Sequence, residues 1–167
     1  GYELVGCDVS GLEDTTKRHY IYKYDPKYVE EQMHPDFDAH VDIAILANLM
    51  TEEEANWFKA CDRYFESLGE KSTPRQVDVQ VLRESDTPED DWGIRKSKLK
   101  KVRHLAKITN FSSTYGIGYK KLAKQLKISD SKAKKIIAAY WDRNWAIKEF
   151  VKKELNQTVI TLSLITI

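Results

Sequence analysis

The chain has 167 residues, 41% of them hydrophobic and 32% charged, which is enough for one ordinary domain or two small lobes with a real core. No apolar run approaches the roughly 20 residues that cross a bilayer, and the first residues lack the basic leader and apolar stretch of a signal peptide. Two cysteines, Cys7 and Cys61, are too few for a disulfide scaffold and lack metal-ligand spacing, so we expect a reducing, cytoplasmic compartment.

The net charge of +1 hides a strong asymmetry along the chain. Residues 1–94 contain 9 Lys or Arg and 22 Asp or Glu, whereas residues 95–153 contain 18 and 3. Such a split indicates that the second half faces a polyanion. The alternative is that the two halves neutralise each other, or that the basic side chains merely solvate helices, and charge alone does not decide between them.

The first half of the chain predicts a strand followed by helices. Residues 2–7 are typical of a short buried strand that leads to Asp8, whereas residues 11–24 show no clear pattern. Asp25-Pro26 marks a turn. The helices expected after it lie over residues 27–33, over residues 39–50 with Asp38 as N-cap, and from a capping box at Thr51 to about residue 68.

The middle of the chain, residues 69–92, is rich in Gly, Pro and acidic residues and is expected to be a loop or small insertion. Residues 76–82 within it alternate weakly, which favours one strand. One long helical pattern follows over residues 96–114. The further helices expected lie over residues 119–126, 131–140 and 145–155.

The tail, residues 158–167, is rich in β-branched residues and predicts another strand, which would invite aggregation if it stayed unpaired. The expected fold class is therefore mainly α with a small β element (α+β), with a strand near each end of the chain.

Four side chains recur every fourth residue towards the end of the long expected helix: Arg103, Lys107, Phe111 and Tyr115. Residues four apart lie along one face of a helix, so two cations precede two aromatic rings. This order suits a nucleoside triphosphate, because cations bind phosphates and a ring packs on base or sugar. Gly116 then ends the helix. From spacing alone, an ordinary amphipathic helix with aromatic core residues is the alternative.

This face resembles the O-helix of family A (DNA polymerase I-type) DNA polymerases, whose pattern is R-x3-K-x3-(F/Y)-x3-Y-G. Residues 8–13, Asp-Val-Ser-Gly-Leu-Glu, resemble motif A of the same family in the form found in its phage members. His19 also falls where the family has a histidine. Asp38-Ala39-His40 resembles the family's D-I-H stretch, and residues 115–122 resemble the loop and short helix after the O-helix. These segments follow one another in the family's order.

The resemblance implies a polymerase site with Mg²⁺ as cofactor. Asp8 and the backbone of Val9 would hold the metal, and Glu13 would select deoxynucleotides by crowding the sugar 2′ position. Lys107 would also donate a proton to pyrophosphate. The site residues it implies are Asp8 and Lys107 for catalysis, Asp8 and Val9 for metal, Glu13, His40, Arg103, Lys107 and Phe111 for the nucleotide, and Tyr115 and Gly116 for template and primer.

The sequence departs from the family in three ways. Thr15 stands where the family has an arginine. The connection from His40 to Arg103 is far longer than in phage relatives, so residues 51–95 are expected to be an acidic insertion that avoids DNA and binds a partner protein or covers the fingers. The third motif, H-D-E, is absent from the sequence, so the chain alone is not expected to polymerise DNA.

The chain is accordingly expected to be a fragment or split subunit of a DNA polymerase. Its partners would be a DNA template–primer, a dNTP and a complementing polymerase chain, with no membrane, in the cytoplasm of a cell or of a phage host. The expected organisation is a partial palm with motif A over residues 1–24, the start of the fingers over 25–50, the acidic insertion over 51–95, the fingers with the O-helix over 96–157 and a terminal strand over 158–167.

Two other functions stay open. Residues 121–137 resemble a helix-turn-helix with Ile128-Ser129 at the turn, which would make the chain a DNA-binding module without catalysis. The second open function is that of a non-catalytic structural or regulatory fragment that is held by a partner. A polymerase fragment should bind dNTP–Mg²⁺, whereas a helix-turn-helix should bind duplex DNA and ignore nucleotides.

Overall fold

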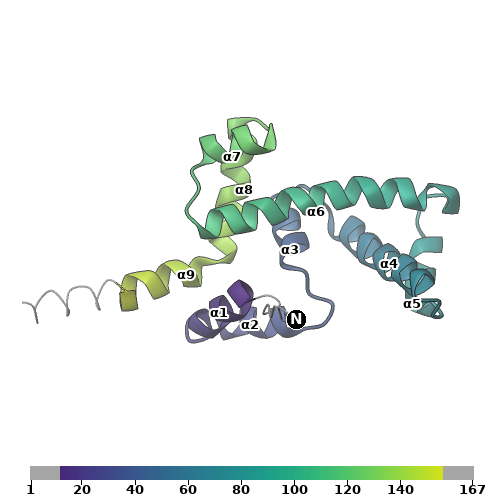
Figure 1. Ribbon diagram of the computed structural model, residues 1–167, viewed down its shortest axis with the longest axis horizontal. Coiled ribbons are helices and arrows are strands. Elements are labelled where there is room, and N and C mark those ends of the chain that lie inside the picture. Colours follow the sequence, from purple (N-terminus) through teal and green to yellow (C-terminus); the bar gives the residue numbers. More distant parts are fainter. Residues whose placement is uncertain (1–11, 156–167) are drawn as a thin grey trace, which may run out of the picture. The chain divides into compact units, whose positions relative to one another are not determined.

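The structure, a computed structural model, describes residues 12–155 of the chain, and every element in this range is helical (Figure 1). The described residues fall into two compact units, one built from parts of Gly1–Phe37 and Asn144–Ile167 and the other from Asp38–Arg143. The elements are α1 (Leu12–Ile21), α2 (Pro26–Met33), α3 (Ala39–Leu46), α4 (Glu52–Gly69), α5 (Gln76–Arg83), a 3-10 turn (Glu89–Asp91), α6 (Trp92–Thr114), α7 (Tyr119–Leu126), α8 (Asp130–Arg143), α9 (Trp145–Phe150) and a π-helical turn (Val151–Leu155).

The predicted α+β fold class was wrong for residues 12–155, which contain no strand. The stretch at residues 76–82 is part of helix α5, and the supposed loop over 69–92 contains that helix. The two strands expected at the ends, over residues 2–7 and 158–167, lie outside the described residues. Residues 11–24, which showed no pattern, include helix α1, whose single buried residue is Ile21.

The first unit has a small core between α1, α2 and α9. Ile21, Tyr28, Val29 and Ala146 are buried together there. Pro26 begins α2, where its missing N–H costs nothing, and the Asp25 carboxylate accepts from the Tyr28 N–H at 3.1 Å. Glu154 accepts hydrogen bonds from Lys23 at 2.9 Å and from the Tyr24 hydroxyl at 2.8 Å, and the bond from Lys23 leads the effects that lower the pKa of Glu154.

In the second unit, the predicted caps set where two helices begin. The Asp38 carboxylate accepts from the N–H groups of His40 and Val41, which opens α3. The expected capping box opens α4, because Thr51 accepts from the Glu54 N–H and the Glu54 carboxylate accepts from the Thr51 N–H. Helix α3 ends at Leu46, four residues before the predicted end, because Asn48 adopts a left-handed backbone with φ of +53°.

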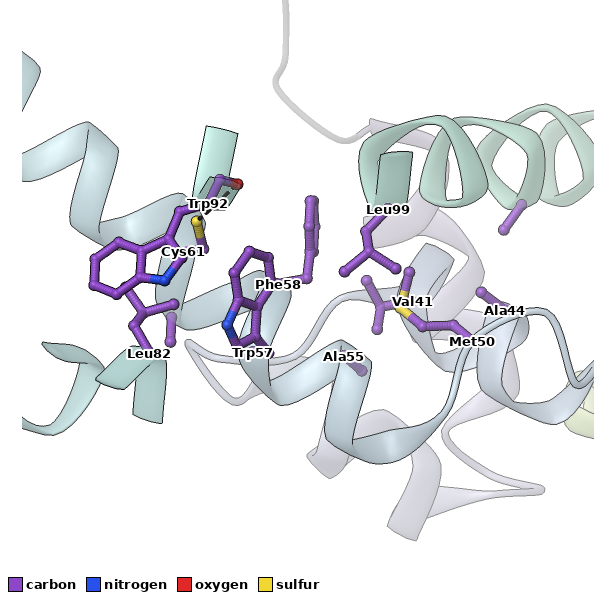
Figure 2. Packing of buried hydrophobic residues seen from close by; sticks show 12 residues of the cluster. Val41, Ala44, Met50, Ala55, Trp57, Phe58, Cys61, Leu82, Trp92 and Leu99 are labelled. Atoms are coloured by element: carbon purple, nitrogen blue, oxygen red, sulfur yellow. Dashed lines mark hydrogen bonds between the residues drawn. The ribbon is translucent and has the colours of Figure 1, made fainter. Parts of the chain in front are cut away.

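The largest core joins α3, α4 and α5 to α6, from which it takes Trp92, Leu99 and Ala106. Trp57, Cys61, Leu82 and Trp92 gather at one end of this cluster, while Leu99 faces Val41 and Met50 at the other (Figure 2). Burial is the main effect that raises the pKa of the Cys61 thiol, to about 11. Residues 51–95 therefore fold as a helical pair packed on α6.

Asp78 is a buried carboxylate within this helical pair and is only 1% exposed. The Arg63 guanidinium donates to it through Nε at 3.1 Å and through Nη2 at 2.6 Å. A bidentate ion pair of this kind supplies the charge-assisted hydrogen bonds that a buried carboxylate needs. It fixes α5 against α4.

Helix α6 begins at Trp92, four residues before the predicted start, and ends at Thr114 as predicted. Gly116 follows with φ of +74°, its N–H bonds to the Ser113 carbonyl at 2.9 Å, and the Ile117 N–H bonds to the Ser112 carbonyl at 3.0 Å. These two bonds form a Schellman motif, which uses glycine for its left-handed residue. The chain then turns into α7, whose bounds match the prediction.

Candidate functional site

The second half of α6 presents the four predicted side chains to solvent rather than to the core. Lys107 is exposed, Phe111 is 41% exposed and Tyr115 is 76% exposed. The Arg103 side chain is 34% exposed. The helix buries other residues here, namely Ala106, Thr109 and Ser113. The alternative in which the aromatic rings belong to the core therefore does not apply to Phe111 or Tyr115.

Arg103 forms an ion pair with Asp38, at 2.6 Å between Nε and Oδ2. The other carboxylate oxygen accepts from the N–H groups of His40 and Val41, at 2.9 and 3.1 Å. Partial burial would raise the pKa of Asp38, but the hydrogen bond and charge of Arg103, aided by the two backbone N–H groups, bring it below its ordinary value. One carboxylate thus ties the start of α3 to the middle of α6.

His40 lies beside the same face of α6. Its ring centroid is 6.1 Å from that of Phe111, and the Lys107 ammonium is 6.0 Å from the Phe111 ring centroid. The Asn110 amide nitrogen lies 2.9 Å from His40 Nδ1 and donates to the Ala39 carbonyl at 3.1 Å. The structure therefore brings His40, Lys107 and Phe111 together from two helices that are distant in sequence.

Sequence reasoning missed two contributors to this arrangement. Asp38 was predicted as an N-cap but not as the partner of Arg103, and Asn110 was not singled out. Helical periodicity contains a signal for Asn110, because it follows Arg103 by seven residues and so lies on nearly the same face. The pairing of Asp38 with Arg103 had no such signal, since it depends on how α3 packs on α6.

Three other predicted site residues lie outside this unit or outside the described residues. Asp8 and Val9 lie outside the described residues. Glu13 is exposed on α1, which belongs to the other compact unit. Within residues 12–155, no group of three or more His, Cys, Asp or Glu side chains is arranged to hold a metal ion.

The helix-turn-helix candidate folds as α7 and α8, which pack on each other through Leu122, Ala123 and Ala133. Helix α8 is also bound to the rest of its unit. Its Tyr140 hydroxyl is 2.7 Å from Thr114 Oγ1, and its Arg143 forms a 2.9 Å ion pair with Asp42. The α7–α8 pair is thus part of the unit that contains α6. In the part of the chain that the structure covers, no helix is long and apolar enough to span a membrane.

Residues 93–166 match DNA polymerase family A. The matched segment starts in the first turn of α6 and contains Arg103, Lys107, Phe111 and Tyr115. A 68-residue segment is also 37% identical to DNA polymerase I of Helicobacter pylori. It makes up 41% of this chain but 8% of that relative, so the chain spans a small part of the polymerase it resembles. No solved structure gives a significant match.

The family match thus supports the resemblance to family A DNA polymerases over residues 93–166. Residues 1–92 lie outside the family match, and with them the motif A pattern at Asp8 and the D-I-H-like stretch that ends at His40. Those two assignments, and the phage-like character inferred from the first, stay predictions.

Proposed function

We propose that this chain is part of a family A DNA-directed DNA polymerase, in which the exposed face of α6 binds an incoming dNTP beside a DNA template–primer. The observation that carries the proposal is the line of Arg103, Lys107 and Phe111 on a helix within the segment that matches the family. Two cations and an exposed ring in this order complement a triphosphate and its nucleoside.

Each residue of this face has a chemical role in the proposal. Arg103 and Lys107 bind the phosphates, where Arg offers a planar fork and Lys a compact charge. The primer 3′-hydroxyl loses its proton to water, and its oxygen attacks the α-phosphorus. The bond from that phosphorus to the oxygen that bridges to the β-phosphate breaks, and Lys107 Nζ donates a proton to the leaving pyrophosphate. Phe111 stacks on the nucleotide. His40 binds a phosphate from the start of α3.

Template and primer lie at the end of the same helix in this proposal. Tyr115 is largely exposed just after α6, and the Gly116 turn directs the chain away from it, which leaves its ring accessible to the template base and the primer-terminal pair. Glu13 selects against ribonucleotides through the 2′ position, by family resemblance.

Mg²⁺ enters the proposal through the family resemblance of Asp8 and Val9. The cation would stabilise negative charge on the phosphates when bound. The residues over 12–155 provide no carboxylate cluster that fits it, so we assign no step of the reaction to the metal.

Nucleotide titration tests the proposed face directly. We expect the chain to bind dATP in the presence of Mg²⁺, and Arg103→Ala and Lys107→Ala each to abolish detectable binding. Lys98→Ala is the matched control, because Lys98 is exposed on α6 nine residues before Lys107 and so lies on the opposite side of the helix. An equal loss in the control would attribute the effect to overall charge rather than to the face.

The same samples distinguish the helix-turn-helix alternative. That module would bind duplex DNA and show no affinity for dATP. Retention of dATP binding by both Arg103→Ala and Lys107→Ala would contradict the proposal.

We further propose that these 167 residues do not polymerise DNA by themselves, since a two-metal site needs more carboxylates than the motif A aspartate supplies. Primer extension with and without a candidate complementing chain tests this. Extension by the chain alone would refute it.

We also propose that residues 51–95 are an insertion within the fingers that does not contact DNA. Exposed acidic side chains begin α4 at Glu52 and Glu53, and they would repel a phosphate backbone. The insertion is fixed to α6 through the core that contains Trp57 and Trp92. Crosslinking of a DNA template–primer to the chain should therefore leave residues 51–95 unlabelled.

A further inference from the structure

We infer that Asn110 is a positioning residue, which fixes the His40 ring as the neutral tautomer protonated on Nε2, so that the ring presents an N–H donor to a phosphate. The phosphate part of this inference rests on the proposed function. The tautomer part rests on the contacts of Asn110 alone.

The neighbours of the Asn110 amide determine its orientation. One terminal atom of that amide lies 3.1 Å from the Ala39 carbonyl oxygen and 2.9 Å from His40 Nδ1. A carbonyl oxygen can only accept a hydrogen bond. The atom that faces it must therefore be the amide NH₂, because the flipped amide would place two carbonyl oxygens against each other.

The orientation of this amide determines the tautomer of the His40 ring. The NH₂ group has two hydrogens, one for the Ala39 carbonyl and one for His40 Nδ1. Nδ1 must then accept, so in the neutral ring the proton is on Nε2.

The contacts of the Asn110 amide all come from one of its two ends. The Asn110 Oδ1 atom is buried and has no hydrogen-bond partner within the described residues. Both bonds of the amide are therefore made by its NH₂ group, and both lead to the start of α3, one to the Ala39 carbonyl and one to His40 Nδ1. A leucine at this position would leave the ring without the donor that sets its tautomer.

The His40 ring lies beside side chains of one face of α6. His40 lies beside Phe111, with 6.1 Å between ring centroids, while Asp38 and Asn110 join the first residues of α3 to α6 at two points. The two points on α6 are Arg103 and Asn110, seven residues or about two turns apart. A phosphate bound by Arg103 and Lys107 thus meets a histidine whose orientation is set by the same helix.

Long-range ¹H–¹⁵N NMR of the ¹⁵N-histidine-labelled chain tests the tautomer without any nucleotide. His40 signals are identified by their loss in His40→Gln. We expect the pattern of the neutral Nε2–H tautomer in the unmutated chain. In Asn110→Asp the carboxylate accepts instead of donating, so we expect a proton on Nδ1. Asn48→Asp, the same change at an exposed left-handed residue of the same unit, should leave the His40 pattern unaltered.

Dissociation constants for dATP with Mg²⁺ test the phosphate part. Asn110→Leu, which adds no charge, should weaken binding roughly three- to tenfold, as expected for one misdirected hydrogen bond. Circular dichroism checks that the helices remain.

An Nδ1–H pattern in the unmutated chain would overturn the tautomer assignment. Unchanged dATP affinity in Asn110→Leu would overturn the positioning role. If the unmutated chain binds no dATP, the proposed function and the phosphate part fail together, while the NMR result still decides the tautomer.

Discussion

Asp38 accepts a 2.6 Å hydrogen bond from the Arg103 guanidinium with one carboxylate oxygen while its other oxygen caps helix α3. The same carboxylate therefore does two separable things. Its charge balances the cation that we propose for triphosphate binding, and its shape completes the helix start. An asparagine at this position keeps the second role, because Asn and Asp are equally good N-caps.

Asp38→Asn should therefore tighten dATP binding. Removal of a negative charge beside Arg103 leaves more of the guanidinium's charge for a triphosphate, and the partly exposed pair limits the gain to roughly two- to fivefold. Isothermal titration at low salt measures it. Asp42→Asn is the matched control, since Asp42 lies on the same helix and pairs at 2.9 Å with Arg143 instead. Weaker binding in Asp38→Asn would show that the carboxylate positions Arg103 rather than neutralising it.

The lowered pKa of Asp38 also makes a prediction about acid stability. A carboxyl whose pKa in the folded state lies below its ordinary value of 3.8 stabilises the fold above that value, and this contribution is lost as pH falls through the lowered pKa. Asp38→Asn should thus be less stable than the unmutated chain at pH 6, and the difference should disappear in strong acid. Urea unfolding over this pH range measures it, and a difference that grows on acidification would contradict it.

The packing of α5 on the largest core predicts a strong contrast between two positions of this helix. Leu82 is fully buried, so Leu82→Ala should lower the free energy of unfolding by about 2–5 kcal/mol. Val77 is 62% exposed, so Val77→Ala should change it by less than about 0.5 kcal/mol. Equal effects in chemical denaturation would mean that α5 does not pack as described.

Alanine in place of Gly93, within α6, and in place of Gly116, in the turn after it, should change the free energy of unfolding in opposite directions. Neither Gly116 nor Gly93 has an atom within 4 Å of where a Cβ would lie, so crowding plays no part. Gly116→Ala places a side chain at φ of +74° and should cost about 1–2 kcal/mol. Gly93→Ala lies within a helix and should stabilise by up to about 1 kcal/mol. Thermal unfolding compares them, and stabilisation by both would exclude the left-handed turn.

Local signals predicted most of the helices, and the exceptions have physical causes. The alternation of Val77, Val79 and Val81 suggested a strand, but the residues that face the core are Asp78 and Leu82, four apart on a helix. A buried aspartate hides the helical pattern from any reading based on apolar residues. Arg63, which makes its burial possible, lies on another helix. Helix α1 was not predicted from the sequence, because Ile21 is its one buried residue and almost no amphipathic pattern exists.

The candidate site was predictable as far as one helix determines it. Residues four apart share a face whatever surrounds them, so Arg103, Lys107 and Phe111 followed from spacing. The contacts of Asp38 and Asn110 did not, because each joins α3 to α6 across a gap of more than sixty residues of chain. That gap contains the folded α4–α5 pair, so no local pattern links its two ends.

Helix α6 is one uninterrupted rod of 23 residues, about 34 Å long. The indole of Trp92 is buried at one end, in the core shared with α4 and α5, and Arg103 and Lys107 lie in the other half. A rod of this kind acts as a lever. If a bound nucleotide draws the far end of α6 to a new position, the α4–α5 pair moves with it. A ligand that binds this pair more tightly in one of the two positions would therefore shift the equilibrium of the rod from a distance, with no contact to the triphosphate.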